Sequence, residues 1–546
     1  MAKSSPESVR GFIGARDLRR DWLIIALMLL LILSFGIYVA IGIFVPEKSA
    51  MAPILSISIF FTFAIPIAIW SRPQLGVYLI VFCSCLFVQS PKEGEIDPLT
   101  AVPLFWNVST IGYNYLNTQA LSVVQFNLGE IIIGITVLSW IIHEISLRRF
   151  QLKGGRFFPW LTAYMACTVF GAVNGIANGG DFTFVLWELR AQFYLYIAYL
   201  MATNMFRNRK DIYQIIWFLA IGVGIKSVIG ALIFASNPNV SPDEGVLRHE
   251  DSLLMNFLIL ASALFSIGQM EPKLRRAMAV FLIPAITTVL ANGRRASIAA
   301  LFVSLPLCMG MLGALIAERR KQMIKLASVI GFIAMFYLPV AWNGKGVWAL
   351  PARAIRSQTS PDERDASSDY YRLAESQNLK YTRDQNPFLG YGYGREYITI
   401  FEQYGRTDVF ARILPHNGIL WIWMRLGHVG FYCFWMFFAS ILVWGPQMLR
   451  KLKDPSLKIL GIYGIGSFLM LVMYGKYDLS FANYRVMIIV GILLGVCASA
   501  PYVDALQEEE KRLEKEREVF RAPVFTPEEV IKHEDAVEEW RTRTQW

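Results

Sequence analysis

Charged residues are scarce in this sequence, and their scarcity indicates its class. They make up 17% of the 546 residues, whereas hydrophobic residues make up 55%; a soluble domain has about 25% charged and about 45–50% apolar residues. The mean hydropathy is +0.42. Residues 21–44, DWLIIALMLLLILSFGIYVAIGIF, form an apolar run that is too long for a signal-peptide core and lacks a small-residue cleavage site. These features exclude an ordinary soluble protein and predict a polytopic membrane protein.

Cysteine and histidine are also few. The six cysteines lie inside apolar runs without a Cys-x-x-Cys spacing, and only five histidines are present. This distribution argues against a disulfide framework and a zinc site, so we expect no metal and no cofactor. The net charge of +10 would favour nucleic-acid binding on a soluble chain, but the excess lies at short loops between apolar segments, as membrane topology demands. We therefore expect no nucleic-acid partner.

The apolar segments predict an all-α protein in the lipid bilayer with about fourteen transmembrane helices. The candidates are 22–45, 52–71, 75–90, 120–142, 157–175, 182–203, 212–235, 252–269, 276–292, 296–316, 323–341, 418–447, 457–474 and 481–500. If the N-terminus is cytoplasmic, all strongly basic short loops but one fall on the cytoplasmic face, and both termini are cytoplasmic. The predicted parts are then a cytoplasmic N-terminus (1–21), transmembrane helices (22–341), a large extracytoplasmic loop (342–415), further transmembrane helices (416–501) and a cytoplasmic tail (502–546).

The tail and the large loop carry predictions of their own. ALQEEEKRLEKEREVFR, at 505–521, has Glu-to-Lys and Glu-to-Arg spacings that predict a solvated helix. The tail 502–546 is either a docking element for a cytoplasmic partner or a stabilising tail. The loop 342–415 is too long for a passive connection, and its composition suits carbohydrate stacking, phosphate binding or contact with anionic headgroups. Its aromatic and arginine residues include Trp342, Trp348, Tyr370, Tyr371, Tyr391, Tyr393, Arg353, Arg356, Arg364, Arg372, Arg383, Arg395, Arg406 and Arg412.

Two charged motifs lie at predicted outer ends of helices. VLWELRAQFYLY, at 185–196, carries Glu188 and Arg190 inside a spanning segment. Charges there are costly and indicate either a function or an ion pair that serves packing. GVLRHEDSLLMN, at 245–256, places Arg248 before the next helix, and we expect Asp251 or the following serine to cap that helix.

A third motif, LANGRRAS at 290–297, interrupts the helical pattern. Asn292 and Gly293 break the helix, and Arg294 and Arg295 follow on the predicted outer face. Adjacent arginines there suit bidentate recognition of a phosphate, and the alternative is anchoring to lipid headgroups.

Two glycine-containing motifs follow. NPFLGYGYG, at 386–394, lies in the large loop, and LPHNGILWIWMRLGHVG, at 414–430, closes it. In the second motif His416 and Asn417 precede an apolar helix, while Gly427 and Gly430 lie within it. Small residues at such positions permit a bend or close packing of helices.

Taken in order, these motifs resemble those of the O-antigen ligase and O-antigen polymerase superfamily of bacterial membrane glycosyltransferases, over roughly residues 120 to 447. LANGRRAS resembles the family's Thr-Gly-Ser-Arg-Gly-Ala, with Arg294 on the family arginine. NPFLGYGYG resembles Pro-x-x-Gly-x-Gly-x-Gly, and residues 416–430 fit His-Asn, nine residues, Gly-x-x-Gly. RHEDSLLMNFLILASAL, at 248–264, is similar to the segment where a family arginine precedes a spanning helix. Two departures are Arg295 in place of a small glycine, and His-Glu-Asp where the family has Asn-Pro-Asn.

The resemblance implies an enzyme of the bacterial cytoplasmic (inner) membrane that acts on the extracytoplasmic face. It would move a glycan from an undecaprenyl diphosphate donor to an acceptor hydroxyl. The acceptor is lipid A–core in ligases and another lipid-linked repeat in polymerases, and the sequence does not separate the two.

The residues fit an inverting, metal-independent transfer. A leaving pyrophosphate needs cations, and an attacking hydroxyl needs a base. The expected catalytic residues are His416, as base or acceptor-orienting group, and Arg294. The expected pyrophosphate ligands are Arg190, Arg248, Arg294 and Arg295. The candidates for the loop or acceptor site are Arg372, Gly390, Gly392, Gly394 and Asn417.

A polytopic transporter and a non-catalytic subunit of a membrane assembly are the alternatives. A transporter predicts charges near the membrane midplane and related halves, whereas the notable charges here cluster at predicted outer ends and no internal repeat is visible. A structural subunit would not need arginine and histidine motifs converging on one face. The sequence therefore favours glycosyl transfer.

Overall fold

The computed structural model describes most of the chain between residues 52 and 520 as helices joined by short turns. The described residues are 30, 33, 52–89, 97–111, 125–148, 150–237, 245–344, 349–360, 363–402 and 410–520. The expected span 22–45 thus lies almost entirely outside the described residues. The chain forms two units, residues 1–501 and 502–546, and the described part of the second is the end of helix α17 (Tyr484–Phe520).

Within the described residues, ten helices are long and apolar enough to cross a membrane. They are α5 (Leu128–Ser146), α6 (Phe158–Ala177), α8 (Arg209–Ser236), α9 (His249–Gly268), α10 (Pro272–Asn292), α11 (Arg295–Leu315), α12 (Arg320–Ala341), α15 (Gly418–Arg450), α16 (Pro455–Gly475) and α17. Three further helices match expected spans: α2 (Ala52–Ser71), α3 (Gln74–Leu86) and α7 (Phe182–Met205). The polytopic helical fold is confirmed; the described part of the chain holds ten candidate spans, and the expected count of fourteen stays a prediction.

Individual helices begin where their capping groups allow. The span expected at 120–142 is found at Leu128–Ser146, because Asn127 and Glu130 form a reciprocal capping box there. The break expected at residues 292–293 is confirmed, since α10 ends at Asn292 and Gly293 adopts a left-handed conformation with φ 61°. The cap expected at Asp251 is wrong: α9 begins two residues earlier, after Arg248.

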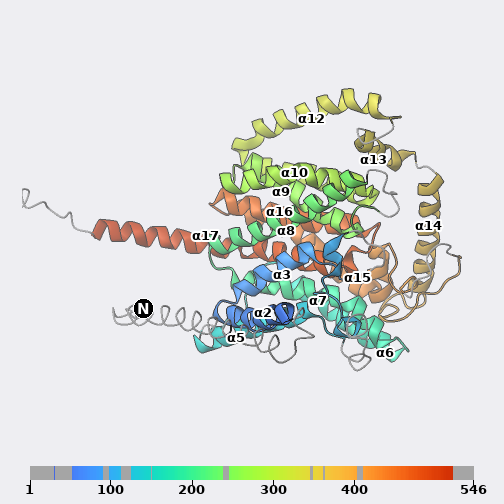
Figure 1. Ribbon diagram of the computed structural model, residues 1–546, viewed down its shortest axis with the longest axis horizontal. Helices are drawn as coiled ribbons and strands as arrows, with labels where there is room; N and C mark the ends of the chain where they lie inside the picture. The colour runs from blue at the N-terminus through green and yellow to red at the C-terminus, as the bar shows by residue number, and fades with distance from the viewer. Residues whose placement is uncertain are drawn as a thin grey trace, which may run out of the picture. The chain divides into compact units, whose positions relative to one another are not determined.

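Helices α9, α16 and α17 form the centre of the first unit. In their most apolar stretches 78%, 83% and 89% of the residues are buried within the chain, whereas none of those in α12 are. Helix α9 packs against α10 and α16, and Figure 1 shows these three running side by side. Exposure of the apolar side chains of α12 costs little free energy only if they face lipid rather than water.

The expected large loop, 342–415, contains two helices, α13 (Leu350–Thr359) and α14 (Glu363–Asp384). Helix α13 packs on α10, α11 and α12, and α14 packs on α15 (Figure 1). This interval is connected to Asp181 through the carbonyl of Gly394, to Arg295 through Asp369 and to Asp478 through the charge of His416, and Asn292 joins residues 246 and 247 to the same region. We call this assembly of turns the loop end of the bundle.

Candidate active site

His416 lies at the loop end in a pair with a buried carboxylate. Its Nδ1 is 3.2 Å from Oε1 of Glu375, and its backbone N–H donates to Oε2 at 2.8 Å. The Glu375 side chain is 0% exposed and that of His416 is 25% exposed. The Tyr371 ring packs edge-on against the imidazole at 5.5 Å. Because Nδ1 faces the carboxylate, Nε2 is the nitrogen left for a substrate, an arrangement suited to a general base.

A second imidazole–carboxylate pair lies beside the first. Nδ1 of His249 is 3.4 Å from Oδ2 of Asp478. The Tyr474 hydroxyl lies 3.0 Å from the same carboxylate oxygen and 2.9 Å from the carbonyl oxygen of His249. Burial by itself would raise the pKa of Asp478, but the hydrogen bond and charge of His249, followed by the charge of His416, lower it below its ordinary value. Asp478 is therefore a carboxylate within electrostatic range of both histidines.

The segments that carry Arg294 and Arg248 meet next to these pairs. Arg294 lies within electrostatic range of Tyr474, and a Cβ on Gly245 would lie 3.8 Å from its Nη2. Asn292 fixes the two segments, since its Oδ1 accepts hydrogen bonds from the N–H groups of residues 246 and 247, and its Nδ2 donates to the carbonyl of Arg248 at 3.5 Å. The motifs at 245–256 and 290–297 thus form one local structure.

Arg295, in contrast, points to the helices of the large loop. Its two terminal nitrogens lie 3.1 and 2.7 Å from the carboxylate of Asp369 in α14. Arg372 lies 3.7 Å from the same carboxylate. This bidentate pair connects α11 to α14, so both arginines are already engaged by an anion of the protein.

The glycine motifs pack directly against one another. Helix α15 is interrupted at Gly427, with φ 61° and ψ −166°, so the bend expected from this glycine is confirmed. The interruption frees the carbonyls of residues 424 and 425, which accept hydrogen bonds from the N–H groups of Tyr391 and Gly392. A Cβ on Gly390 would lie 2.3 Å from the carbonyl oxygen of Arg425. Glycine is thus required by the close approach of two backbones.

Gly392 and Gly394 are restricted in the same way. Both have positive φ, 83° and 76°. A Cβ on Gly392 would lie 2.5 Å from the Cα of Gly175, and one on Gly394 would lie 2.4 Å from the Val185 side chain. These glycines therefore allow the segment to pass between α6, α7 and α15. Asn417 also has a local role, as the residue that caps α15 through its side chain.

Glu188 and Arg425 fasten this packing from inside. Nε of Arg425 is 2.7 Å from Oε1 of Glu188, and both side chains are 0% exposed. Arg425 also donates to the carbonyls of Gly392, Arg395 and residue 413. Glu188 accepts from the N–H of Gly394 and from the indole of residue 421. We call this group the Glu188–Arg425 clamp. Of the two roles expected for Glu188, a function or an ion pair that serves packing, it corresponds to the ion pair.

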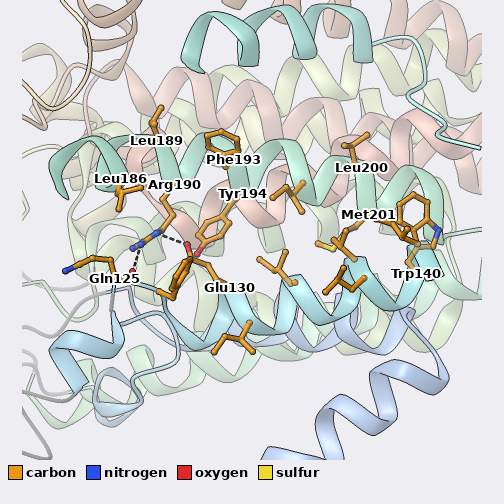
Figure 2. A pocket seen from close by; sticks show the side chains of 18 of the residues that line it. Gln125, Glu130, Trp140, Leu186, Leu189, Arg190, Phe193, Tyr194, Leu200 and Met201 are labelled. Atoms are coloured by element: carbon orange, nitrogen blue, oxygen red, sulfur yellow. Dashed lines mark hydrogen bonds and ion pairs between the residues drawn. The ribbon is translucent and has the colours of Figure 1, made fainter. Parts of the chain in front are cut away.

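Arg190 lies apart from the other expected phosphate ligands. Its Nε is 2.8 Å from Glu130, and it donates to the Asn107 side chain and the carbonyl of Gln125. These groups lie at one end of an apolar cavity of about 910 Å³ between α5 and α7. Figure 2 shows Arg190, Glu130 and Gln125 at that end and Trp140 at the other.

A further charged network is buried behind the site. Asp251 lies 2.6 Å from Nη2 of Arg485 and 3.9 Å from Nζ of Lys226. Lys226 pairs in turn with Asp97, and Arg485 lies 3.8 Å from Glu250. Each buried charge thus has an opposite partner, as charges within a membrane protein require.

The structure places His416 near Asp478, Arg294 near Tyr474 and Arg248 directly before His249, whereas Arg295 pairs with Asp369 and Arg190 with Glu130. Sequence reasoning missed Glu375, Tyr474 and Asp478. Glu375 lies inside a polar helix, Tyr474 lies in the last turn of the apolar helix α16, and Asp478 follows that helix without a motif. Their only sequence signal is a charge next to a predicted outer helix end, which many residues share.

Comparison with known proteins agrees with the predicted family. Residues 278–435 match the family model described as O-antigen ligase. The matched region includes Arg294, Glu375, His416 and the glycine motifs, so the predicted resemblance is confirmed there. No curated protein matches the chain.

Proposed function

From the match of residues 278–435 to the O-antigen ligase family model, we propose that this protein transfers a glycan from a polyprenyl-diphosphate donor to an acceptor hydroxyl. The reaction takes place at the loop end, which we place outside the cytoplasmic membrane of a bacterium on the basis of the basic loops. The observation that supports it most is the His416–Glu375 pair, since it places a partly exposed imidazole on a buried carboxylate within the matched region.

His416 serves as the base. Nε2 takes the proton of the acceptor hydroxyl as the acceptor oxygen attacks the anomeric carbon, and the bond from that carbon to the donor phosphate oxygen breaks. Glu375 orients the imidazole through Nδ1 and stabilises the imidazolium that forms. A single displacement of this kind inverts the anomeric centre, and the proton balance requires no metal ion.

Arg294 and Arg248 neutralise the departing diphosphate. Both lie in the segment joined by Asn292, next to Tyr474 and the two imidazole–carboxylate pairs. Guanidinium groups suit phosphate oxygens because they form paired hydrogen bonds. Arg295 and Arg190 would first have to leave Asp369 and Glu130, so we assign them to positioning the site.

A lipid-linked donor also fits the protein outside the site. The cavity between α5 and α7 is lined almost wholly by apolar residues and extends from Gln125 to Trp140 (Figure 2). An isoprenoid chain could lie there, or against other lipid-facing surfaces of the bundle. We propose the cavity as the first of these to test.

The test is glycan transfer by the purified protein in detergent with EDTA present. Undecaprenyl diphosphate-linked oligosaccharide is supplied with and without lipid A–core. A single shifted product that requires lipid A–core identifies a ligase, and a ladder of longer lipid-linked glycans without it identifies a polymerase. Absence of both products from a folded protein would contradict the proposal and favour a transporter or a non-catalytic subunit.

A further inference from the structure

His249 has the geometry of a ligand-binding group, although the family resemblance assigns it no role. It is the first residue of α9, and its side chain is 48% exposed. Nδ1 faces Asp478, so Nε2 is the nitrogen directed away from the carboxylate. An imidazole fixed through one nitrogen and open at the other is the common arrangement of a binding or proton-carrying histidine.

The carboxylate behind His249 is itself held in place. Oδ1 of Asp478 accepts a hydrogen bond from the backbone N–H of Leu479 at 2.8 Å. Oδ2 lies 3.0 Å from the Tyr474 hydroxyl, which also lies 2.9 Å from the carbonyl oxygen of His249. His249 is therefore connected to the end of α16 through both its backbone and its side chain, which limits the positions its ring can take.

The charges around His249 are mixed and favour an anion on the open side. Asp478 and Glu250 are the nearby carboxylates; the first is bound to His249, and the second lies 3.8 Å from Arg485. Arg294, in the turn between α10 and α11, acts on Tyr474, and His416 acts on Asp478. The two direct partners of His249 are Asp478 and Tyr474; Arg294 and Glu250 act electrostatically on Tyr474, and His416 acts on Asp478.

We propose that His249, oriented by Asp478 and Tyr474, binds a phosphate oxygen of the donor diphosphate through its Nε2–H. This inference rests on the proposed function and adds a second imidazole to it, with a role different from that of His416. His416 accepts the proton of the acceptor, whereas protonated His249 stabilises the charge on the leaving phosphate without giving up its proton. The bond changes of the transfer are unaltered.

The test measures binding of inorganic pyrophosphate to the full-length protein in nanodiscs, at about pH 6 and about pH 8.5, on either side of the range in which an imidazole loses its charge. The variants are His249→Gln, which is neutral, and His249→Lys, which stays charged. His143→Gln removes an imidazole from the last turn of α5 and is the matched control. Pyrophosphate gains charge over this range, so the affinity ratio of each variant to the wild type at the same pH is compared.

We expect His249→Gln to weaken binding about tenfold at the lower pH and to approach the wild type at the higher pH, because the lost interaction is a charge-assisted hydrogen bond. His249→Lys should bind at least as well as the wild type at the higher pH, and His143→Gln should match the wild type at both. Equal affinity of His249→Gln and wild type at the lower pH would overturn the inference. So would an equal loss in the Gln and Lys variants at both pH values, since that indicates a purely structural role, and so would a wild type that binds no pyrophosphate.

Transfer assays on the same samples separate this inference from the proposed function. A wild type that transfers glycan while pyrophosphate binding is independent of His249 would overturn the inference alone. A wild type without transfer, but with pyrophosphate binding that depends on His249 as described, would overturn the proposed function and leave an anion site.

Discussion

The Glu188–Arg425 clamp and the His416–Glu375 pair each use one residue in or just before α15, since Arg425 lies within this helix and His416 two residues before it, yet their surroundings differ. In the clamp both charged side chains are 0% exposed and are surrounded by carbonyls, an indole and the N–H of Gly394. In the His416 pair the carboxylate is equally buried, but the imidazole is 25% exposed.

This difference separates a structural ion pair from a candidate reactive one. A charge whose hydrogen-bonding groups are all bound by the protein has nothing to offer a substrate, whereas Nε2 of His416 remains available. Among the arginines, Arg295 pairs with Asp369 and Arg190 with Glu130, whereas Arg294 acts on Tyr474 beside the histidines. The burial of a charged side chain and the groups that bind it, rather than its residue type, therefore distinguish a candidate site residue from a structural one.

The largest effect is expected on folding, from breaking the clamp on one side only. Arg425→Met leaves the Glu188 carboxylate buried without its cation, and such a loss costs about 3–5 kcal/mol. The apparent melting temperature in detergent should fall strongly, and the double variant Glu188→Gln, Arg425→Met should recover part of the loss. An unchanged melting temperature in Arg425→Met would show that the pair does not hold the two helices together.

A large effect on catalysis is expected from Arg294. Arg294→Ala should lower transfer about a hundredfold, the scale for removing a group that stabilises developing charge, with an unchanged melting temperature. Arg294→Lys should recover part of the rate because it keeps the charge but not the paired hydrogen bonds. The control is Arg276→Gln, which removes an exposed arginine near the start of α10, the helix that precedes Arg294. Wild-type transfer by Arg294→Ala would remove it from the site.

A smaller catalytic effect is expected from the partner of His416. Glu375→Gln keeps an acceptor for the backbone N–H but no longer stabilises an imidazolium, so transfer should fall about tenfold to a hundredfold. Initial rates across neutral pH measure it. If Glu375→Gln matched the wild type, His416 would not act through this carboxylate.

The smallest effect is expected from Arg295, whose partner Asp369 is 46% exposed. Exposed pairs contribute little, so Arg295→Gln and Asp369→Asn should each lower transfer by about threefold or less, and their combination should add nothing further. A loss greater than tenfold in Arg295→Gln with a neutral Asp369→Asn would instead make Arg295 a phosphate ligand.

Much of the fold could be predicted from sequence because membrane helices and their breaks leave local signals. Apolar length marks the spans, and Gly427 and Gly293 mark a bend and a helix end. The number of spans was harder to predict, because α7 carries the charged residues Glu188 and Arg190 and α3 has only 13 residues. Such helices depend on their neighbours for stability, which a single segment does not reveal.

The candidate site was predicted only in part for the same reason. His416 and Arg294 belong to recognisable motifs, but their partners do not. Glu375 is separated from His416 by 41 residues and Glu188 from Arg425 by 237, so the pairing depends on the path of the chain. Gly390 and Gly392 were predicted as acceptor candidates, which stays a prediction, and their close contacts with the backbones of Arg425 and Gly175 could not be predicted from the sequence.

The measurement that tests the central claim most directly is single-turnover glycan transfer by His416→Ala beside the wild type, with melting temperature recorded for both. The account predicts a loss of at least about a hundredfold with an unchanged melting temperature, because the imidazole is partly exposed while the clamp holds the fold. Transfer at the wild-type rate by a folded His416→Ala protein would contradict it.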